Sequence, residues 1–278
     1  MSPAPWRGAA LLVAAMGAFS LSDVLAKQLA PYLSPVQVAW VRYALLLATV
    51  LPCAGRPTAW RTRHPLLHAG RSAGLIGSAV LFQHAIQAMP VAEATAMVFA
   101  SPLFVTLLAA LTLGETVSAR RWLAVLLGFV GVLVVVQPGQ LAFGGAEVFP
   151  LLSSMAWAGA VICTRRLASE SVWTTMLYPA VAGTLLLAPW LPASELVSSP
   201  RRALTALAMA ASWCAAQWLT VLAYRSAAAS SIAPFAYSQL LWAALLGAAV
   251  FGHVPQGMAL AGMGLILVSG ALAARGPR

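Results

Sequence analysis

The sequence is poor in charged residues, and acidic residues are the scarcest. Only 8% of its 278 residues are charged, and Asp and Glu together number six. A soluble globular protein carries roughly 25% charged residues because its surface has to be solvated. Here 61% of the residues are hydrophobic, and the mean hydropathy is +0.87. We therefore expect this chain to lie in lipid rather than water.

These scarcities exclude several functional classes. Lys27 is the single lysine and no Gly-Lys-Ser/Thr occurs, so the chain has no Walker A loop for nucleotide phosphates. Basic residues stand singly or in pairs, unlike the clusters of a nucleic-acid-binding surface. The three cysteines lack metal-type spacing, and His64 and His68, which share a helical face, lack a third ligand. We interpret the His64–His68 stretch as a solvated basic loop and expect no metal, no cofactor and no enzyme activity.

Apolar runs long enough to cross a bilayer follow one another along the whole chain. A span needs roughly 17–25 apolar residues, and the runs end at Pro and Gly, as between Pro52 and Pro57. The first run continues beyond the length of a signal-peptide core, so we interpret it as a retained helix. The predicted spans are 7–29, 35–54, 70–89, 92–113, 120–137, 146–166, 172–191, 202–224, 230–250 and 256–274. The sequence therefore predicts an all-α membrane protein with ten transmembrane helices.

The distribution of basic residues predicts the orientation. If the N-terminus is cytoplasmic, the inner loops hold twelve Lys and Arg residues and the outer loops hold three, with Arg42 inside the second span. Cytoplasmic loops of membrane proteins carry such an excess of positive charge. We expect a multi-pass inner-membrane protein with both termini in the cytoplasm.

The chain repeats itself weakly at an offset of 138 residues. Residues 26–30 (AKQLA) align with residues 164–168 (TRRLA), and Gly114-Glu115 aligns with Gly252-His253. Each half, 1–139 and 140–278, holds five predicted spans. Since five is odd, the halves enter the membrane from opposite sides, which is the inverted-repeat plan of many secondary transporters. Duplication without transport is the alternative.

Several short motifs resemble one family. They are Val41-Arg42-Tyr43, Ala92-Glu93-Ala94-Thr95-Ala96, Ser101-Pro102-Leu103-Phe104-Val105-Thr106, Gly114-Glu115, Ala223-Tyr224-Arg225 and Ile232-Ala233-Pro234-Phe235-Ala236-Tyr237. In this order and spacing the chain resembles, in two copies, the EamA branch of the drug/metabolite transporter superfamily. It departs from that pattern at His253 and Leu240. The resemblance implies ten helices, cytoplasmic termini and a central cavity lined by spans three, four, eight and nine.

Three ionisable residues lie within or beside the first two spans. Asp23 and Lys27 share one helical face at a spacing of four, and Arg42 enters from the second span. A charge at membrane depth costs at least about 2.5–3.5 kcal/mol, so its presence needs a reason. We hypothesise one cluster that acts as a gate or contacts a substrate carboxylate. A structural network with snorkelling side chains is the alternative.

Polar and aromatic side chains form stripes on the four spans that the resemblance places around the cavity. The candidate substrate-binding residues are Gln83, His84, Gln87, Met97, Ser101, Trp213, Gln217, Tyr224, Phe235, Ser238, Gln239 and Trp242. Such stripes could stack a planar ligand and hydrogen-bond its edges. Polar contacts between helices, and aromatic anchors at the membrane interface, are the alternative interpretation. Pro102 and Pro234 interrupt spans four and nine.

Together these features favour a secondary transporter that moves a small organic metabolite by alternating access. We expect export of an amino-acid-like or amphipathic compound. Two alternatives stay open: import of a vitamin or nucleoside-like compound, such as riboflavin or S-adenosylmethionine, and a non-transporting accessory subunit. The expected partners are the substrate and the lipid bilayer. A coupling proton and a homo-oligomer are open alternatives.

Overall fold

In the computed structural model the chain folds into α-helices and short 3-10 turns, with no strand among the described residues. Those residues are 5–52, 62–113, 119–136, 145–167, 170–191, 194, 199–226, 233–252 and 257–274. The first half contains α1 (Pro5–Leu29), α2 (Pro35–Val50), α3 (Pro65–Ala88), α4 (Val91–Val98), α5 (Ser101–Leu113) and α6 (Ala119–Val136). The second half contains α7 (Val148–Arg166), α8 (Val172–Leu186), η2 (Ala188–Trp190), α10 (Pro200–Ser226), η3 (Ala233–Tyr237), α12 (Ser238–Phe251) and α13 (Gly257–Ala274). The all-α prediction is confirmed.

The second helix of each half begins at a serine cap. The Ser34 hydroxyl accepts from the Gln37 amide, and the Gln37 side chain accepts from the Ser34 amide, which forms a capping box before Pro35. In the second half the Ser171 hydroxyl accepts from the Thr174 amide at 3.1 Å. The caps satisfy backbone donors that lipid could not satisfy.

Two predicted continuous spans are broken in the structure. The predicted span 92–113 forms α4 and α5, which are separated at Phe99 and Ala100. There the Ala100 amide bonds to the Met97 carbonyl, a tighter turn than an α-helix makes. In the predicted span 230–250 the described residues likewise form the 3-10 helix η3 before α12 begins at Ser238. Both breaks lie beside a proline, in agreement with the interruption expected from Pro102 and Pro234.

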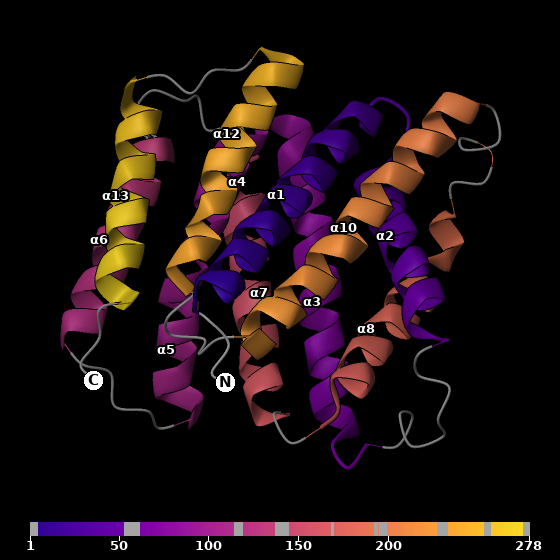
Figure 1. The fold of residues 1–278 in the computed structure, drawn as a ribbon, viewed down its shortest axis with the longest axis horizontal. Coiled ribbons are helices and arrows are strands. Elements are labelled where there is room, and N and C mark those ends of the chain that lie inside the picture. The colour runs from indigo at the N-terminus through magenta and orange to yellow at the C-terminus, as the bar shows by residue number, and fades with distance from the viewer. Residues whose placement is uncertain are drawn as a thin grey trace.

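The most extensive helix contacts of the two halves correspond to one another when the halves are exchanged. The α1–α10 contact corresponds to the α7–α3 contact, and α2–α10 corresponds to α8–α3. The pairs α2–α8 and α6–α13 each map onto themselves, and the α1–α12 contact corresponds to the α7–α5 contact. Figure 1 shows α6 and α13 together at one side of the bundle and α2, α8 and α10 at the other.

Both chain ends lie at one end of the bundle, which we call the termini-bearing end (Figure 1). Alternate helices run in opposite directions, so the corner between α3 and α4 and the link between α1 and α2 lie at the opposite end.

Helix length and hydropathy alone identify few of the helices as membrane spans. Among the described residues only Trp6–Leu29 is both long and apolar enough to cross a membrane by this criterion, with a mean hydropathy of 1.9. Shorter apolar helices occupy Pro35–Val50, Val148–Thr164, Phe235–Phe251 and Gly257–Ser269. The number of ten spans therefore stays a prediction.

Glycine allows α3 and α7 to approach closely. A Cβ on Gly74 would lie 2.7 Å from the carbonyl oxygen of Ala156, whereas nothing lies within 4 Å of a Cβ on Gly159 of α7. We expect Gly74→Val to lower the melting temperature in detergent by several degrees, because overpacking costs about 1–3 kcal/mol. Gly159→Val is the matched control and should change it little. Equal effects of the two variants would contradict this account of the interface.

Candidate functional site

Gln83 is a buried side chain of which both polar atoms lack a hydrogen-bond partner among the described residues. It lies in α3 with 0% of its surface exposed, and neither its Nε2 nor its Oε1 has a partner among the described residues. Thr95 in α4 is 3% exposed, and its hydroxyl also lacks a partner there. A buried polar group without a partner costs about 1–3 kcal/mol. These two side chains can therefore bind a ligand without first breaking a protein contact.

The neighbouring candidates on α3 already have partners. His84 Nδ1 donates to the Val80 carbonyl at 2.9 Å, and the His84 ring stacks on Phe149 of α7 with centroids 5.2 Å apart. Gln87 Nε2 donates to the Leu33 carbonyl at 3.0 Å. Of the three predicted side chains on α3, Gln83 alone has no hydrogen-bond partner among the described residues.

The remaining candidates do not form one continuous polar surface. Met97 is buried in the largest apolar cluster, and Trp213 packs edge-on against Tyr43 with centroids 5.6 Å apart. Ser238 bonds to the Phe235 carbonyl of its own chain segment. These contacts agree better with helix packing than with a ligand for these three side chains.

The other predicted stripe residues are less enclosed. Ser101, Gln217 and Gln239 are half-buried, while Phe235 and Trp242 are 44% and 36% exposed. The side chain of Tyr224 lies outside the described residues. The Gln239 carbonyl accepts from Ser20 of α1, which links α12 to α1.

Two aromatic residues that the sequence analysis did not select meet where the two broken spans bend. Phe99 lies between α4 and α5, and Tyr237 ends η3, with ring centroids 5.1 Å apart. This contact joins the middle of α4–α5 to the start of α12. No local pattern distinguishes either ring from other core aromatics in the sequence.

Asp23 and Arg42 form a buried ion pair. Arg42 Nη2 donates to Asp23 Oδ1 at 2.9 Å and to the Ser22 hydroxyl at 2.8 Å. The Ser22 hydroxyl in turn donates to the Met209 carbonyl of α10 at 2.9 Å. The network links α1, α2 and α10, and pairing compensates the two buried charges.

Lys27 does not join that pair, so the expected cluster of three charges is divided in the structure. Its Nζ donates instead to the Met89 carbonyl, at the corner between α3 and α4. It also lies 5.7 Å from the centre of the Phe251 ring. The i, i+4 spacing places Asp23 and Lys27 on one face, but Arg42 is the partner that Asp23 takes.

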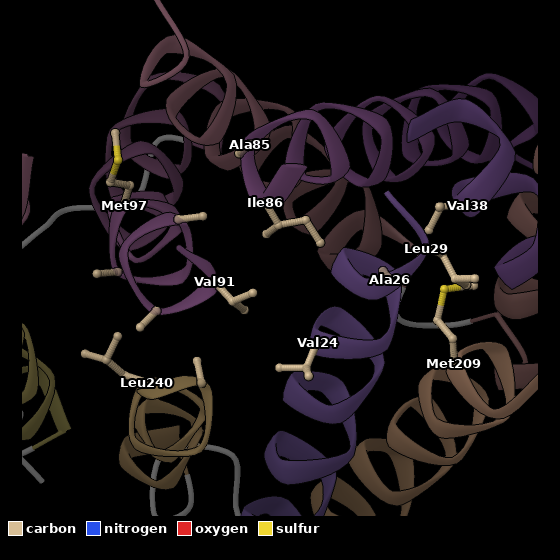
Figure 2. Packing of buried hydrophobic residues seen from close by; sticks show 14 of the residues in the cluster. Val24, Ala26, Leu29, Val38, Ala85, Ile86, Val91, Met97, Met209 and Leu240 are labelled. Atoms are coloured by element: carbon tan, nitrogen blue, oxygen red, sulfur yellow. The ribbon is translucent and has the colours of Figure 1, made fainter. Parts of the chain in front are cut away.

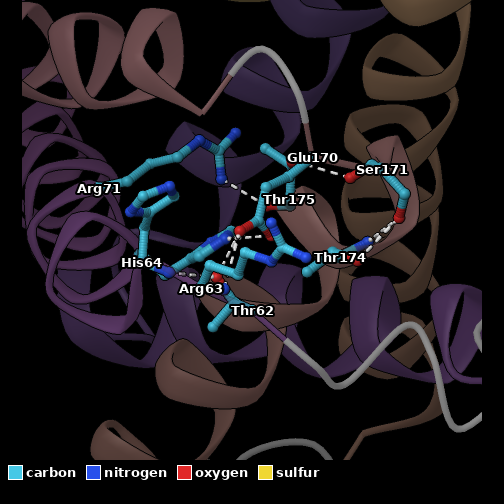
Figure 3. Close-up of polar contacts among 9 residues, drawn as sticks. Thr62, Arg63, His64, Arg71, Glu170, Ser171, Thr174 and Thr175 are labelled. Carbon is cyan, nitrogen blue, oxygen red and sulfur yellow. Dashed lines mark hydrogen bonds and ion pairs between the residues drawn. The ribbon is translucent and has the colours of Figure 1, made fainter.

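A polar cluster at the termini-bearing end joins the start of α3 to the link between α7 and α8 (Figure 3). Glu170 accepts from the Thr62 hydroxyl at 2.6 Å and from His68 Nε2 at 3.1 Å. His68 is fully buried and stacks on Tyr178, so its interpretation as part of a solvated loop is wrong. Within the described chain no three metal-binding side chains come together.

Arg71 extends this cluster toward α7 and α8. Its Nε donates to the Thr164 hydroxyl at 2.8 Å, and its Nη1 donates to the Thr175 carbonyl at 2.6 Å. Figure 3 shows Arg71, Thr175 and Glu170 side by side. The contacts tie the beginning of one half's third helix to the first two helices of the other half.

Removing one member of the Asp23–Arg42 pair should lower the stability of the protein more than removing both charges. We expect Arg42→Leu to destabilise by about 3–5 kcal/mol, because Asp23 is left as an uncompensated buried charge. The double variant Asp23→Asn/Arg42→Leu should recover a large part of this loss. Heating purified variants in detergent and measuring the folded fraction checks it. Additive losses would contradict the pairing.

The pH dependence of Glu170 follows from its contacts. Partial burial raises the pKa of the Glu170 carboxyl, but hydrogen bonds from Thr62 and His68 outweigh it, and the net pKa lies below its ordinary 4.5. The resulting stabilisation is complete above pH 4.5 and is lost as the pH falls through the lower folded pKa.

We therefore expect Glu170→Gln to lower the melting temperature in detergent by a few degrees at neutral pH. The difference from wild type should shrink steadily once the pH falls below 4.5. Melting curves of both proteins across this range measure it. A difference that stays constant with pH would show that the carboxylate charge is not the stabilising feature.

Comparison with known proteins gives a consistent family. The sequence model of the EamA-like transporter family matches twice, at residues 6–137 and 145–275. A solved crystal structure aligns over 96% of each chain with a TM-score of 0.64 at 19% identity, so it shares the fold.

Several curated relatives are named as transporters. A riboflavin transporter of Rhizobium johnstonii is 31% identical over 65% of this chain and 63% of its own length. An S-adenosylmethionine uptake transporter of Rickettsia prowazekii is 27% identical over 61% of this chain and 59% of its own. A pseudopaline exporter of Pseudomonas aeruginosa is 29% identical over 66% of this chain and 65% of its own. The matches span less than two thirds of each relative.

Proposed function

Because the chain belongs to the EamA-like transporter family, we propose that it is a secondary transporter that works by alternating access. Members of this family and the relatives named above are multi-pass membrane transporters of small molecules, which supports this role. The proposal adds ten spans, cytoplasmic termini and two inverted repeats at 1–139 and 140–278. The exchange-symmetric packing of the helices and the excess of basic residues on one side support it.

Gln83 is the observation that carries the proposed binding site. A glutamine amide offers two N–H donors and a carbonyl acceptor, and Thr95 offers a hydroxyl that can donate and accept. The two residues stand at equal distances along the chain from Met89, at the corner of α3 and α4, so they lie at similar depth. We propose that both contact the substrate there.

Formal charges on the four spans lie near the helix ends, which narrows the substrate class. Arg71 lies near the start of α3, Glu93 in the first turn of α4, and Arg201 and Arg202 at the start of α10. Between them, the described segments 72–88, 94–98, 101–113, 203–224 and 238–251 contain no Asp, Glu, Lys or Arg. A charged substrate group would lose its hydration there without a compensating charge. The site therefore favours a neutral edge that both donates and accepts hydrogen bonds, such as an amide or imide. A planar vitamin of the riboflavin type has this chemistry, and some relatives are named for it.

Export of an amino-acid-like compound is the second candidate. It is supported by the resemblance to a pseudopaline exporter. Direction depends on the gradient rather than on the contacts of the site, so either direction fits alternating access. Because the chain has no Walker A loop, a gradient of substrate or of protons supplies the energy.

Gln83→Leu tests the site with a readout that separates binding from folding. We expect transport of riboflavin into proteoliposomes to fall at least about tenfold, because a substrate hydrogen bond is lost. The melting temperature without substrate should stay the same or rise, since the variant removes an unpaired buried amide.

Gln28→Leu is the matched control, because Gln28 is exposed on α1, and it should transport normally. S-adenosylmethionine and an amino acid, both charged, are the comparison substrates. Normal transport by Gln83→Leu would contradict the binding role. Transport of the charged compounds alone would favour the second candidate.

A further inference from the structure

Lys27 connects three helices at the opposite end of the bundle. It lies in the last turn of α1, and its Nζ donates at 2.5 Å to the carbonyl of Met89, the residue that follows α3. The same ammonium lies 5.7 Å from the centre of the ring of Phe251, the last residue of α12. One side chain therefore holds the end of α1 against the α3–α4 corner and against the second half of the chain.

Gln87 makes a second bond of the same kind nearby. It lies in the last turn of α3, and its Nε2 donates at 3.0 Å to the carbonyl of Leu33, in the link between α1 and α2. Both bonds run between the end of α1 and the end of α3. In both bonds a side-chain N–H donates to a backbone carbonyl. If the contact opens, water can bond to the donor and to the acceptor that are released.

An apolar layer lies beneath these two bonds. In Figure 2 the side chains of Ile86 and Val91 at the corner lie on the side of α3 and α4 that faces Val24 of α1. Direct packing of α1 against α3 and α4 is nevertheless sparse compared with the α1–α10 and α3–α7 interfaces. The α3–α4 corner is therefore held against α1 by few contacts, whereas the extensive α1–α10 and α3–α7 interfaces hold the rest of the bundle together.

The other end of the same helices is less enclosed. None of the described side chains of α5, which continues α4 toward the termini-bearing end, is buried. By contrast, α4 contributes six buried residues to a helix of eight. In this structure the bundle is therefore packed more tightly around α4, at the opposite end, than around α5, at the termini-bearing end.

We infer that Lys27 and Gln87 form a latch that keeps the opposite end shut in this conformation and is released when the transporter opens there. The inference rests on the proposed alternating access. The internal repeat places a second basic residue, Arg165, at the position equivalent to Lys27, in the last turn of α7 at the termini-bearing end. A basic residue thus lies in the last turn of the first helix of each half.

Accessibility of one introduced cysteine tests the latch. The three native cysteines are replaced by alanine, and Ala92→Cys places a thiol in the first turn of α4, where Ala92 is 5% exposed. A membrane-impermeant maleimide is added to the outside of intact cells, and the rate of labelling is measured. Lys27→Met and Gln87→Leu should each raise this rate several-fold, and the double variant should raise it roughly tenfold or more.

Gln28→Leu is the control, since the exposed Gln28 is adjacent to Lys27 and should leave the labelling rate unchanged. Wild-type labelling rates in both latch variants would overturn the inference. Loss of both variant proteins from the membrane would also overturn it, because the contacts would then serve folding. Riboflavin transport by the same wild-type cells separates the two proposals. A wild type that moves no compound contradicts the proposed function, whereas unchanged labelling in a transporting protein contradicts only the latch.

Discussion

A polar group at membrane depth has to find a partner inside the protein, because lipid offers none. That constraint explains most of the side-chain contacts. Trp40 donates to the Thr184 carbonyl, Ser20 to the Gln239 carbonyl, and Arg42 neutralises Asp23. Against this background an unpartnered amide is informative. Gln83 lies fully buried in α3, neither of its polar atoms has a partner in the described part of the chain, and the binding site that we propose is built around it.

The helix interfaces of the bundle differ in extent: some pairs of helices pack along most of their length, whereas others meet at a few residues. The third helix of each half packs extensively on the first helix of the other, as α10 does on α1 and α3 on α7. Polar networks reinforce both interfaces, through Ser22 and Met209 in one and through Arg71 and Thr164 in the other. The broken spans meet through Phe99 and Tyr237 instead. Helix breaks permit bending, so movement is expected there rather than in the scaffold.

Hydropathy predicted most helix boundaries within a few residues, because Pro and Gly lie between the apolar runs. The face shared by Asp23 and Lys27 was also correct, but spacing on one helix could not show that Arg42 would take Asp23 as its partner. Contacts between distant segments left no local signal. His68 and Glu170 are 102 residues apart in sequence, and only the fold brings them together. Thr95 stood within a family motif, yet its burial without a partner is a property of packing.

The most direct test of the account is metabolite profiling, inside and outside cells, of a strain that lacks the gene and of the same strain expressing it. The account predicts one neutral, hydrogen-bonding metabolite whose distribution across the membrane changes with expression, and the sign of that change gives the direction. Replacing Gln83 by leucine should abolish the change. If no metabolite changes while the protein is present in the membrane, the transporter account is contradicted and an accessory role is favoured.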